Sequence, residues 1–367
     1  RVARETLEGG LRAVIGKMTP EDMGQDRDKF VMTVMREVTA DLANNLDEEV
    51  KQAPTRRSPA LCAELLGSIA HDNVFDLPAT RRDLFKPALA AVTPDDCLAA
   101  LREAWKAPGR MIFVSGNLEL ANPEADIAAA YQESAAVAVA APAKIEESNW
   151  GYTHFGPAGE IVSRRTVADL GIEQVEFKNG VHLNLKKTDF EAASVHLSAR
   201  LGGGLLTQPA DKPGLNLYAS IAAGQMGLGK HSADDLRRIL AGRSVGGGLN
   251  VATDAFMLSG RTTPQDLELE LQYLAAWAID PGYRPEAEFL IFGQLSQFYQ
   301  QLAHAPDGVI QLEAIRKIAG DDPRLGLPSF ETIARYKMED LREWLAPQLA
   351  TGPLELSIVG DIDLDAT

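Results

Sequence analysis

Histidine is the residue type in this sequence best suited to metal chemistry, because zinc enzymes hold their ion with clustered His, Glu or Cys side chains. The six histidines are His71, His154, His182, His196, His231 and His304. No two of them lie within one helical turn, so no helix carries the ligand pair of a zinc hydrolase. His182 and His196 fall on neighbouring expected strands and could meet across a sheet. Because no third ligand is evident, we favour the interpretation that both histidines are polar residues on a solvent-exposed face.

A glycine-rich segment at 224–231 comes close to a phosphate-binding loop. It matches G-x-x-x-x-G-K, but His231 stands where such a loop needs Ser or Thr to hold magnesium. The residues before Gly224 also predict a helix, whereas a phosphate-binding loop follows a strand. We therefore expect the later glycines to end one helix, and Ser232 with Asp235 to cap the next.

The sequence also lacks a complete set of residues for nucleophilic catalysis. It has no G-x-S-x-G motif, and neither Cys62 nor Cys97 has a histidine nearby. Both cysteines stand among apolar helical residues, which predicts two buried free thiols rather than a disulfide or a metal site. Ser68 and Ser115 each stand beside a glycine, where a small residue in tight packing is the simpler interpretation.

Helix signals dominate the first part of the chain, and strands appear in the second. Hydroxyl residues followed by proline, as at Thr93-Pro94, predict helix starts. Helices are expected at about 21–50, 59–71, 94–106, 214–224, 232–241, 264–279, 285–304, 306–319 and 338–349. Strands are expected at 111–114, 172–177, 181–187, 195–201, as a pair over 249–261, and at 354–359. The strand at 111–114 is expected to be buried, and Asn179-Gly180 to form a hairpin turn.

The composition is that of an ordinary globular protein, with 45% apolar and 24% charged residues. The net charge of −16, with arginine pairs isolated among acids, disfavours nucleic acid as a partner. Charged residues interrupt every apolar run before the ~20 residues that a membrane-spanning helix requires. We therefore expect no membrane span.

An internal repeat indicates duplicated domains. Residues 92–120 and 336–364 align without a gap, and each combines a helix, a strand and a glycine. The Ala-, Val- and Pro-rich stretch that starts at 135 is typical of a connector. We expect a truncated domain at 1–134, a linker at 135–158 and a complete relative of the first domain at 159–367. Since the chain opens at Arg1 without methionine, we interpret it as a piece of a longer polypeptide.

Several motifs resemble the pitrilysin/insulinase family of zinc metallopeptidases. The motifs are 175–181 with 186–190, Gly203-Gly204, Pro213-Gly214-Leu215 and 358–361, in the family's order. Residues 19–120 resemble the back half of its second domain, and residues 160–367 its third domain. The resemblance implies an α+β fold of duplicated, mitochondrial-processing-peptidase-like domains, with mainly antiparallel sheets packed against helices.

In an active domain of this family, the helix after the Pro-Gly-Leu turn carries the inverted zinc motif H-x-x-E-H. The resemblance places Leu217, Ser220 and Ile221 at the positions of His, Glu and His, and the downstream ligand near Gln297. None of these side chains holds zinc or takes a proton near pH 7. We therefore expect no catalytic, cofactor or metal residue in this chain, with zinc bound by the parent's N-terminal domain. We also expect Leu217 and Ile221, which share one helix face, to be buried against a sheet as part of the core.

Three functions stay open. The resemblance implies the non-catalytic portion of a two-half zinc metallopeptidase, which helps to enclose a peptide that the N-terminal catalytic part of the same polypeptide hydrolyses. The alternative is an inactive family member that acts as scaffold or as partner subunit of an active peptidase. A nucleotide-dependent enzyme is the third, and it requires a strand before Gly224. The compartment is unknown, and the resemblance alone points to the periplasm.

Overall fold

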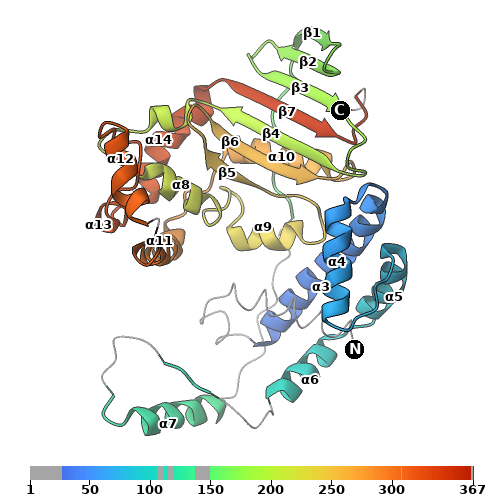
Figure 1. Ribbon diagram of the computed structural model, residues 1–367, viewed down its shortest axis with the longest axis vertical. Coiled ribbons are helices and arrows are strands. Elements are labelled where there is room, and N and C mark those ends of the chain that lie inside the picture. The colour runs from blue at the N-terminus through green and yellow to red at the C-terminus, as the bar shows by residue number, and fades with distance from the viewer. Residues whose placement is uncertain (1–26, 106–110, 115–119, 137–148, 307, 365–366) are drawn as a thin grey trace. The chain divides into compact units, whose positions relative to one another are not determined.

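The computed structural model describes residues 27–105, 111–114, 120–136, 149–306, 308–364 and 367 (Figure 1). The chain divides into two compact units. The first comprises 1–46 and 79–147, and the second comprises 47–78 and 148–367. The expected boundaries of the linker, 135 and 158, stay a prediction.

In the first unit, every regular element among the described residues is a helix. Its helices are α3 (Arg27–Gln52, which continues into the second unit), α5 (Pro78–Ala90), α6 (Pro94–Trp105) and α7 (Pro123–Ala136). The cap of α6 forms as predicted, because Thr93 Oγ1 accepts from Asp96 N at 3.2 Å and Asp96 Oδ2 accepts from Thr93 N at 2.9 Å. The helix expected at 21–50 is confirmed from residue 27 onward, whereas α5 and α7 were not predicted.

Residues 111–114 do not form the buried strand that the sequence predicts. All four side chains are exposed, Met111 by 95% and Phe113 by 86%. A strand needs a neighbouring strand for its backbone hydrogen bonds, and the described part of the first unit offers none. Both copies of the internal repeat form the expected helix, which is α6 in the first copy and α14 (Met338–Thr351) in the second. In the first copy, the described residues do not form the expected strand. Residues 115–119 of that copy lie outside the described residues.

The two cysteines are free, as predicted, but the expected burial is wrong for Cys62. Cys62 is exposed on α4 (Ser58–Ala70), and Cys97 is half-buried on α6. No residue of α4 is buried, and the side chains of Leu65, Leu66 and Ile69 are 45%, 60% and 68% exposed. Apolar neighbours in the sequence therefore indicated a helix here without indicating what packs on it.

The second unit is built on one seven-stranded sheet (Figure 1). Its strands are β1 (Ile161–Val167), β2 (Ile172–Phe177), β3 (His182–Lys187), β4 (Val195–Leu201), β5 (Gly247–Val251), β6 (Phe256–Thr262) and β7 (Leu354–Gly360). The spatial order is β1-β2-β3-β7-β4-β6-β5, and β3–β7 is the one parallel pair of the sheet. This confirms the predicted α+β class with a mainly antiparallel sheet. Strand β1 was not predicted.

The Asn179-Gly180 turn joins β2 to β3, as predicted. Gly180 has φ +83°, a left-handed conformation that glycine adopts at little cost. Its N–H donates to Phe177 O at 2.9 Å, and Asn179 Oδ1 accepts from Val181 N at 3.2 Å. Local residue chemistry was therefore sufficient to locate this hairpin.

Helices of the second unit follow the predicted positions closely. Besides α4, they are α8 (Leu215–Ala223), α9 (Ala233–Leu240), α10 (Leu267–Ile279), α11 (Glu288–Ala303), α12 (Ile315–Ile318), α13 (Phe330–Ile333) and α14. A 3₁₀ turn at Pro285–Ala287 precedes α11, and a π-helical turn at Ile310–Ala314 precedes α12. The short α13 was not predicted. No described helix is both long and apolar enough to cross a membrane.

The core lies between the sheet and the helices α8, α10, α11 and α14. Alternate residues of β4 point into it, with Val195 and Leu197 buried and His196 between them exposed. The helices contribute, among others, Leu215, Tyr218, Leu274, Ile291, Leu341 and Leu345. This packing fixes α8, the helix that the resemblance identifies with the zinc motif.

Candidate functional site

Helix α8 begins directly after Gly214, which has φ +77°. A side chain at this position would place its Cβ 2.6 Å from Pro328 Cδ, so the turn requires glycine. The helix packs against α11, α14 and β5. Its inward side carries Leu215, Tyr218, Ala219, Ala222 and Ala223, all buried. The Pro-Gly-Leu turn thus starts a rigidly held helix, as the resemblance implies.

The three motif positions lie outside that fully buried side. Leu217 and Ile221 pack against the edge of the core, but both are half-buried, which is less than the burial that the sequence predicts. Ser220 is exposed, and its Oγ donates to Asn216 O at 2.9 Å. Gln297 is exposed on α11. Alkyl groups offer zinc no lone pair, so this side of α8 does not fit a zinc ion.

The rest of the described chain adds no alternative metal centre. No group of three or more His, Cys, Asp or Glu side chains among the described residues could hold a metal ion. The correspondence of Leu217, Ser220 and Ile221 to zinc positions stays a prediction of the resemblance.

Histidines placed at the two motif positions test this correspondence. Leu217 and Ile221 are one turn apart on α8 and half-buried, so imidazoles there would lie near each other and reach solvent. We expect the Leu217→His/Ile221→His chain to bind zinc in solution, measured by titration with a fluorescent zinc indicator, although weakly because a third ligand is missing. The wild-type chain and the matched single variant Leu217→His should bind zinc more weakly still. Equal zinc affinity of the single and double variants would show that the two positions lack the geometry of the motif.

The suggestion that His182 and His196 meet across the sheet is wrong. Strand β7 lies between β3 and β4, so His182 is opposite Glu355 and His196 is opposite Val359. The two histidines are separated by a whole strand. Both are exposed, in agreement with the favoured interpretation of polar residues on a solvated face.

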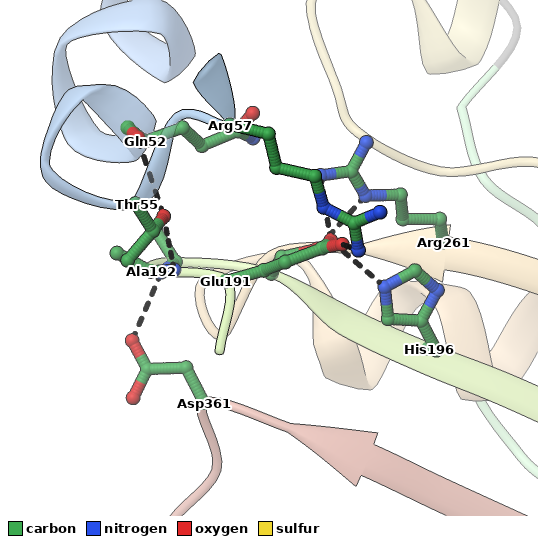
Figure 2. A network of polar contacts seen from close by, with 10 residues as sticks. Gln52, Thr55, Arg57, Glu191, Ala192, His196, Arg261 and Asp361 are labelled. Carbon is green, nitrogen blue, oxygen red and sulfur yellow. Dashed lines mark hydrogen bonds and ion pairs between the residues drawn. The ribbon is translucent and has the colours of Figure 1, made fainter. Parts of the chain in front are cut away.

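His196 instead belongs to a polar network around Glu191 (Figure 2). Its Nε2 lies 3.1 Å from Glu191 Oε2, which also accepts from an Arg261 guanidinium nitrogen at 3.2 Å. An Arg57 guanidinium nitrogen lies 3.6 Å from Glu191 Oε1. The backbone N–H of Ala192, the residue after Glu191, donates to Thr55 Oγ1 at 3.0 Å. The hydrogen bond with His196 lowers the pKa of Glu191. The network joins the residues before α4 to the loop before β4, which is a structural role.

The glycine-rich segment at 224–231 is not a phosphate-binding loop. Helix α8, not a strand, precedes Gly224, so the hypothesis of a nucleotide-dependent enzyme is wrong. The Lys230 ammonium donates to Gly151 O at 2.7 Å. Ser232 Oγ accepts from Asp235 N at 3.1 Å, and an Asp235 carboxylate oxygen accepts from Ser232 N at 3.0 Å. The predicted capping of α9 is therefore confirmed.

The last part of the expected linker packs on the second unit, which the sequence did not predict. Tyr152 is 4% exposed, and its hydroxyl donates to an Asp280 carboxylate oxygen at 2.7 Å. Trp150 stacks on His231 with ring centroids 5.6 Å apart. His231 Nε2 accepts from Gly151 N at 3.0 Å, and burial lowers the pKa of His231. In the sequence, the one indication of this packing is the pair of aromatic residues, Trp150 and Tyr152, that follows the Ala-rich stretch.

Comparison with known proteins gives structural matches alone. No protein-family model and no curated protein matches the sequence. The structure is similar to a mutant of the ferredoxin protease FusC in complex with Arabidopsis ferredoxin, with a TM-score of 0.52 and 16% identity over 92% of this chain. It is also similar to the periplasmic protease PqqL from Escherichia coli, with a TM-score of 0.51 and 20% identity over 92% of this chain. The chain has a pitrilysin/insulinase-like fold.

The pitrilysin-like fold agrees with the resemblance carried by the sequence motifs, and with the sheet and helices described above. The chain covers 40% of the length of FusC and 39% of the length of PqqL. It therefore spans about two fifths of these two proteases. At 16% and 20% identity, the likeness concerns the fold alone.

Proposed function

We propose that this chain is the non-catalytic portion of a two-half, pitrilysin-like peptidase. Two observations support the proposal. Nearly the whole chain matches two fifths of each of two proteases in structure. At the motif positions of α8, the chain has Leu217, Ser220 and Ile221, whose side chains do not bind zinc. In the proposal, zinc is bound outside this chain, on an N-terminal domain of the same polypeptide, and supplies the activated water for peptide hydrolysis.

The contribution of this chain would be to enclose the peptide rather than to react with it. No side chain at the motif positions can act as a general base, since Ser220 Oγ donates to its own helix and its neighbours are alkyl. Closing a site around a peptide positions it and excludes water, both of which raise the rate of a reaction carried out elsewhere. Because PqqL is a periplasmic protease, we propose the periplasm as the compartment.

Complementation tests the proposal. The N-terminal part of the polypeptide is assayed with a fluorogenic peptide, alone and with increasing amounts of this chain. We expect zinc in the N-terminal part, slow cleavage by that part alone, and a saturable rise in kcat/KM on addition of this chain. An unrelated protein of similar net charge is the control.

Two results would contradict the proposal. If the N-terminal part cleaves equally well without this chain, enclosure by the chain contributes nothing. If the N-terminal part holds no zinc and the mixture cleaves nothing, the alternative of an inactive scaffold or partner subunit is favoured instead.

A further inference from the structure

Residues 150–152, here called the strap, pack on the second unit just after the chain enters that unit from the first. The Trp150 indole N–H donates to Gln272 Oε1 at 2.8 Å. The Lys230 ammonium donates to Gly151 O at 2.7 Å. The strap is therefore held by side chains from α10 and from the segment before α9, and not by a strand or helix of its own.

The ring of His231 lies at the centre of these contacts. It is 6% exposed, stacks on Trp150 with ring centroids 5.6 Å apart, and meets Tyr152 edge-on at 5.7 Å. The hydroxyl of Tyr152 is fixed in turn by the carboxylate of Asp280. His231 Nε2 accepts from Gly151 N at 3.0 Å, so the backbone of the strap depends on an imidazole nitrogen.

Only the neutral imidazole can accept this hydrogen bond. Nε2 of an imidazolium carries a proton, so two N–H groups would face each other and the Gly151 amide would lose its acceptor. A Cβ at Gly151 would lie 3.0 Å from Nε2, which shows how closely the backbone approaches the ring. Because imidazole is the side chain that ordinarily changes charge between about pH 5 and 8, mild acid acts on this contact.

The surroundings of His231 disfavour its protonated form. Burial of the ring lowers the pKa of His231, and the positive charges of Lys230 and Arg284 act in the same direction. The carboxylate of Asp235, on α9, acts in the opposite direction. That carboxylate already pairs with the Arg238 guanidinium at 2.6 Å, so it is not free to turn toward the ring. A proton on His231 is therefore costly while the strap is in place.

We propose that the strap is an acid-sensitive latch, docked on the second unit while His231 is neutral and released when Nε2 takes up a proton. Release exposes the two aromatic side chains of the strap and adds residues 150–152 to the chain segment that joins the two units. The proposal goes beyond the peptidase role and does not depend on it, because all the contacts involved lie within the second unit.

The direction of the effect follows from the two states of the strap. Once the strap is released, the His231 ring is solvated and its pKa returns toward the ordinary 6.5, above that of the docked ring. Acid therefore favours the released state, which binds the proton more readily. Docking is at full strength above about pH 7.5 and weakens below 6.5, by at most tenfold for each pH unit.

Hydrogen exchange of the complete chain, followed by mass spectrometry between pH 7.5 and 5.5, tests the proposal. The readout is the protection factor of a peptide that contains residues 150–152, which corrects for the effect of pH on the exchange chemistry. We expect this protection to fall several-fold, and at most about tenfold, while that of β4 does not fall. An equal fall in β4 would indicate unfolding of the unit rather than release of the strap. That result, or constant protection of the strap, would overturn the proposal.

Three variants assign the effect to the proton on His231. In His231→Gln, the side-chain oxygen can accept from Gly151 N but does not titrate, so strap protection should no longer depend on pH. His231→Lys places a permanent cation there, and the strap should be unprotected throughout the range. The matched control is His154→Gln, at an exposed histidine of the same segment, which should keep the wild-type profile. A wild-type profile in His231→Gln, or wild-type protection at pH 7.5 in His231→Lys, would contradict the assignment.

Discussion

The Glu270→Gln variant is expected to gain stability relative to the wild type as the pH rises. Between pH 4.5 and pH 8, the difference between their free energies of unfolding should shift by about 3 kcal/mol in favour of the variant. Glu270 is fully buried on α10. One carboxylate oxygen accepts from Gly246 N at 2.8 Å, and the other has no hydrogen-bond partner among the described residues. Burial raises the pKa of Glu270 from its ordinary 4.5 to about 7. The neutral acid is thus the form that suits the fold.

The sign follows from comparing the folded and unfolded states. Below pH 4.5 the carboxyl is protonated in both states, and its contribution to the free energy of unfolding is complete. As the pH rises through 7, the unfolded state releases its proton first and the contribution is lost. The Gln side chain does not titrate, so this loss is absent from the variant.

Denaturant unfolding of the wild type and Glu270→Gln between pH 4.5 and 8 measures the effect. The control is Glu268→Gln, an exposed position on the same helix, which should leave the pH profile unchanged. Parallel profiles for Glu270→Gln and the wild type would mean that Glu270 ionises in the fold as readily as in the unfolded chain.

Replacing Gly204 with Ala is expected to lower the free energy of unfolding by about 4 kcal/mol, a large fraction of the ~5–15 kcal/mol that is typical of a folded domain. Gly204 has φ +55°, where a Cβ is strained in any case. An added Cβ would also lie 2.5 Å from Ala252 O and 2.6 Å from Ala255 O. Both are backbone atoms between β5 and β6, and they cannot move without displacing that hairpin.

Gly171 provides the matched control for the Gly204 variant. It has φ +61° but no atom within 4 Å of an added Cβ. Gly171→Ala should therefore cost only the ~1–2 kcal/mol of left-handed backbone strain. Circular dichroism and denaturant unfolding of the two variants separate the steric collision from the strain. Equal losses at the two sites would contradict the close packing around Gly204.

The features that could be predicted from the sequence are those set by local chemistry. Alternation identified β4, Asn179-Gly180 identified the β2–β3 hairpin, and Ser232 with Asp235 identified the start of α9. In each case the residues that define the element are neighbours in the chain. The same holds for α8, because the Pro-Gly-Leu turn at its start located the helix.

What the sequence did not reveal depends on partners far along the chain. Strand β7 pairs with β3 although more than 160 residues separate them, so nothing near His182 shows that β7 divides it from His196. Strand β1 is exposed along nearly its whole length and therefore lacks the apolar alternation that marks a strand. Residues 111–114 are apolar but have no described strand to pair with.

Zinc content and peptide cleavage of this chain by itself show whether its pitrilysin-like domain is non-catalytic, as we propose. The chain is purified without chelators, incubated with excess zinc, passed through gel filtration and analysed for metal and for cleavage of a peptide library. We expect zinc far below one equivalent and no cleavage above the buffer rate. One equivalent of zinc together with cleavage that a chelator abolishes would contradict it, and would show that Leu217, Ser220 and Ile221 do not mark the position of the metal site.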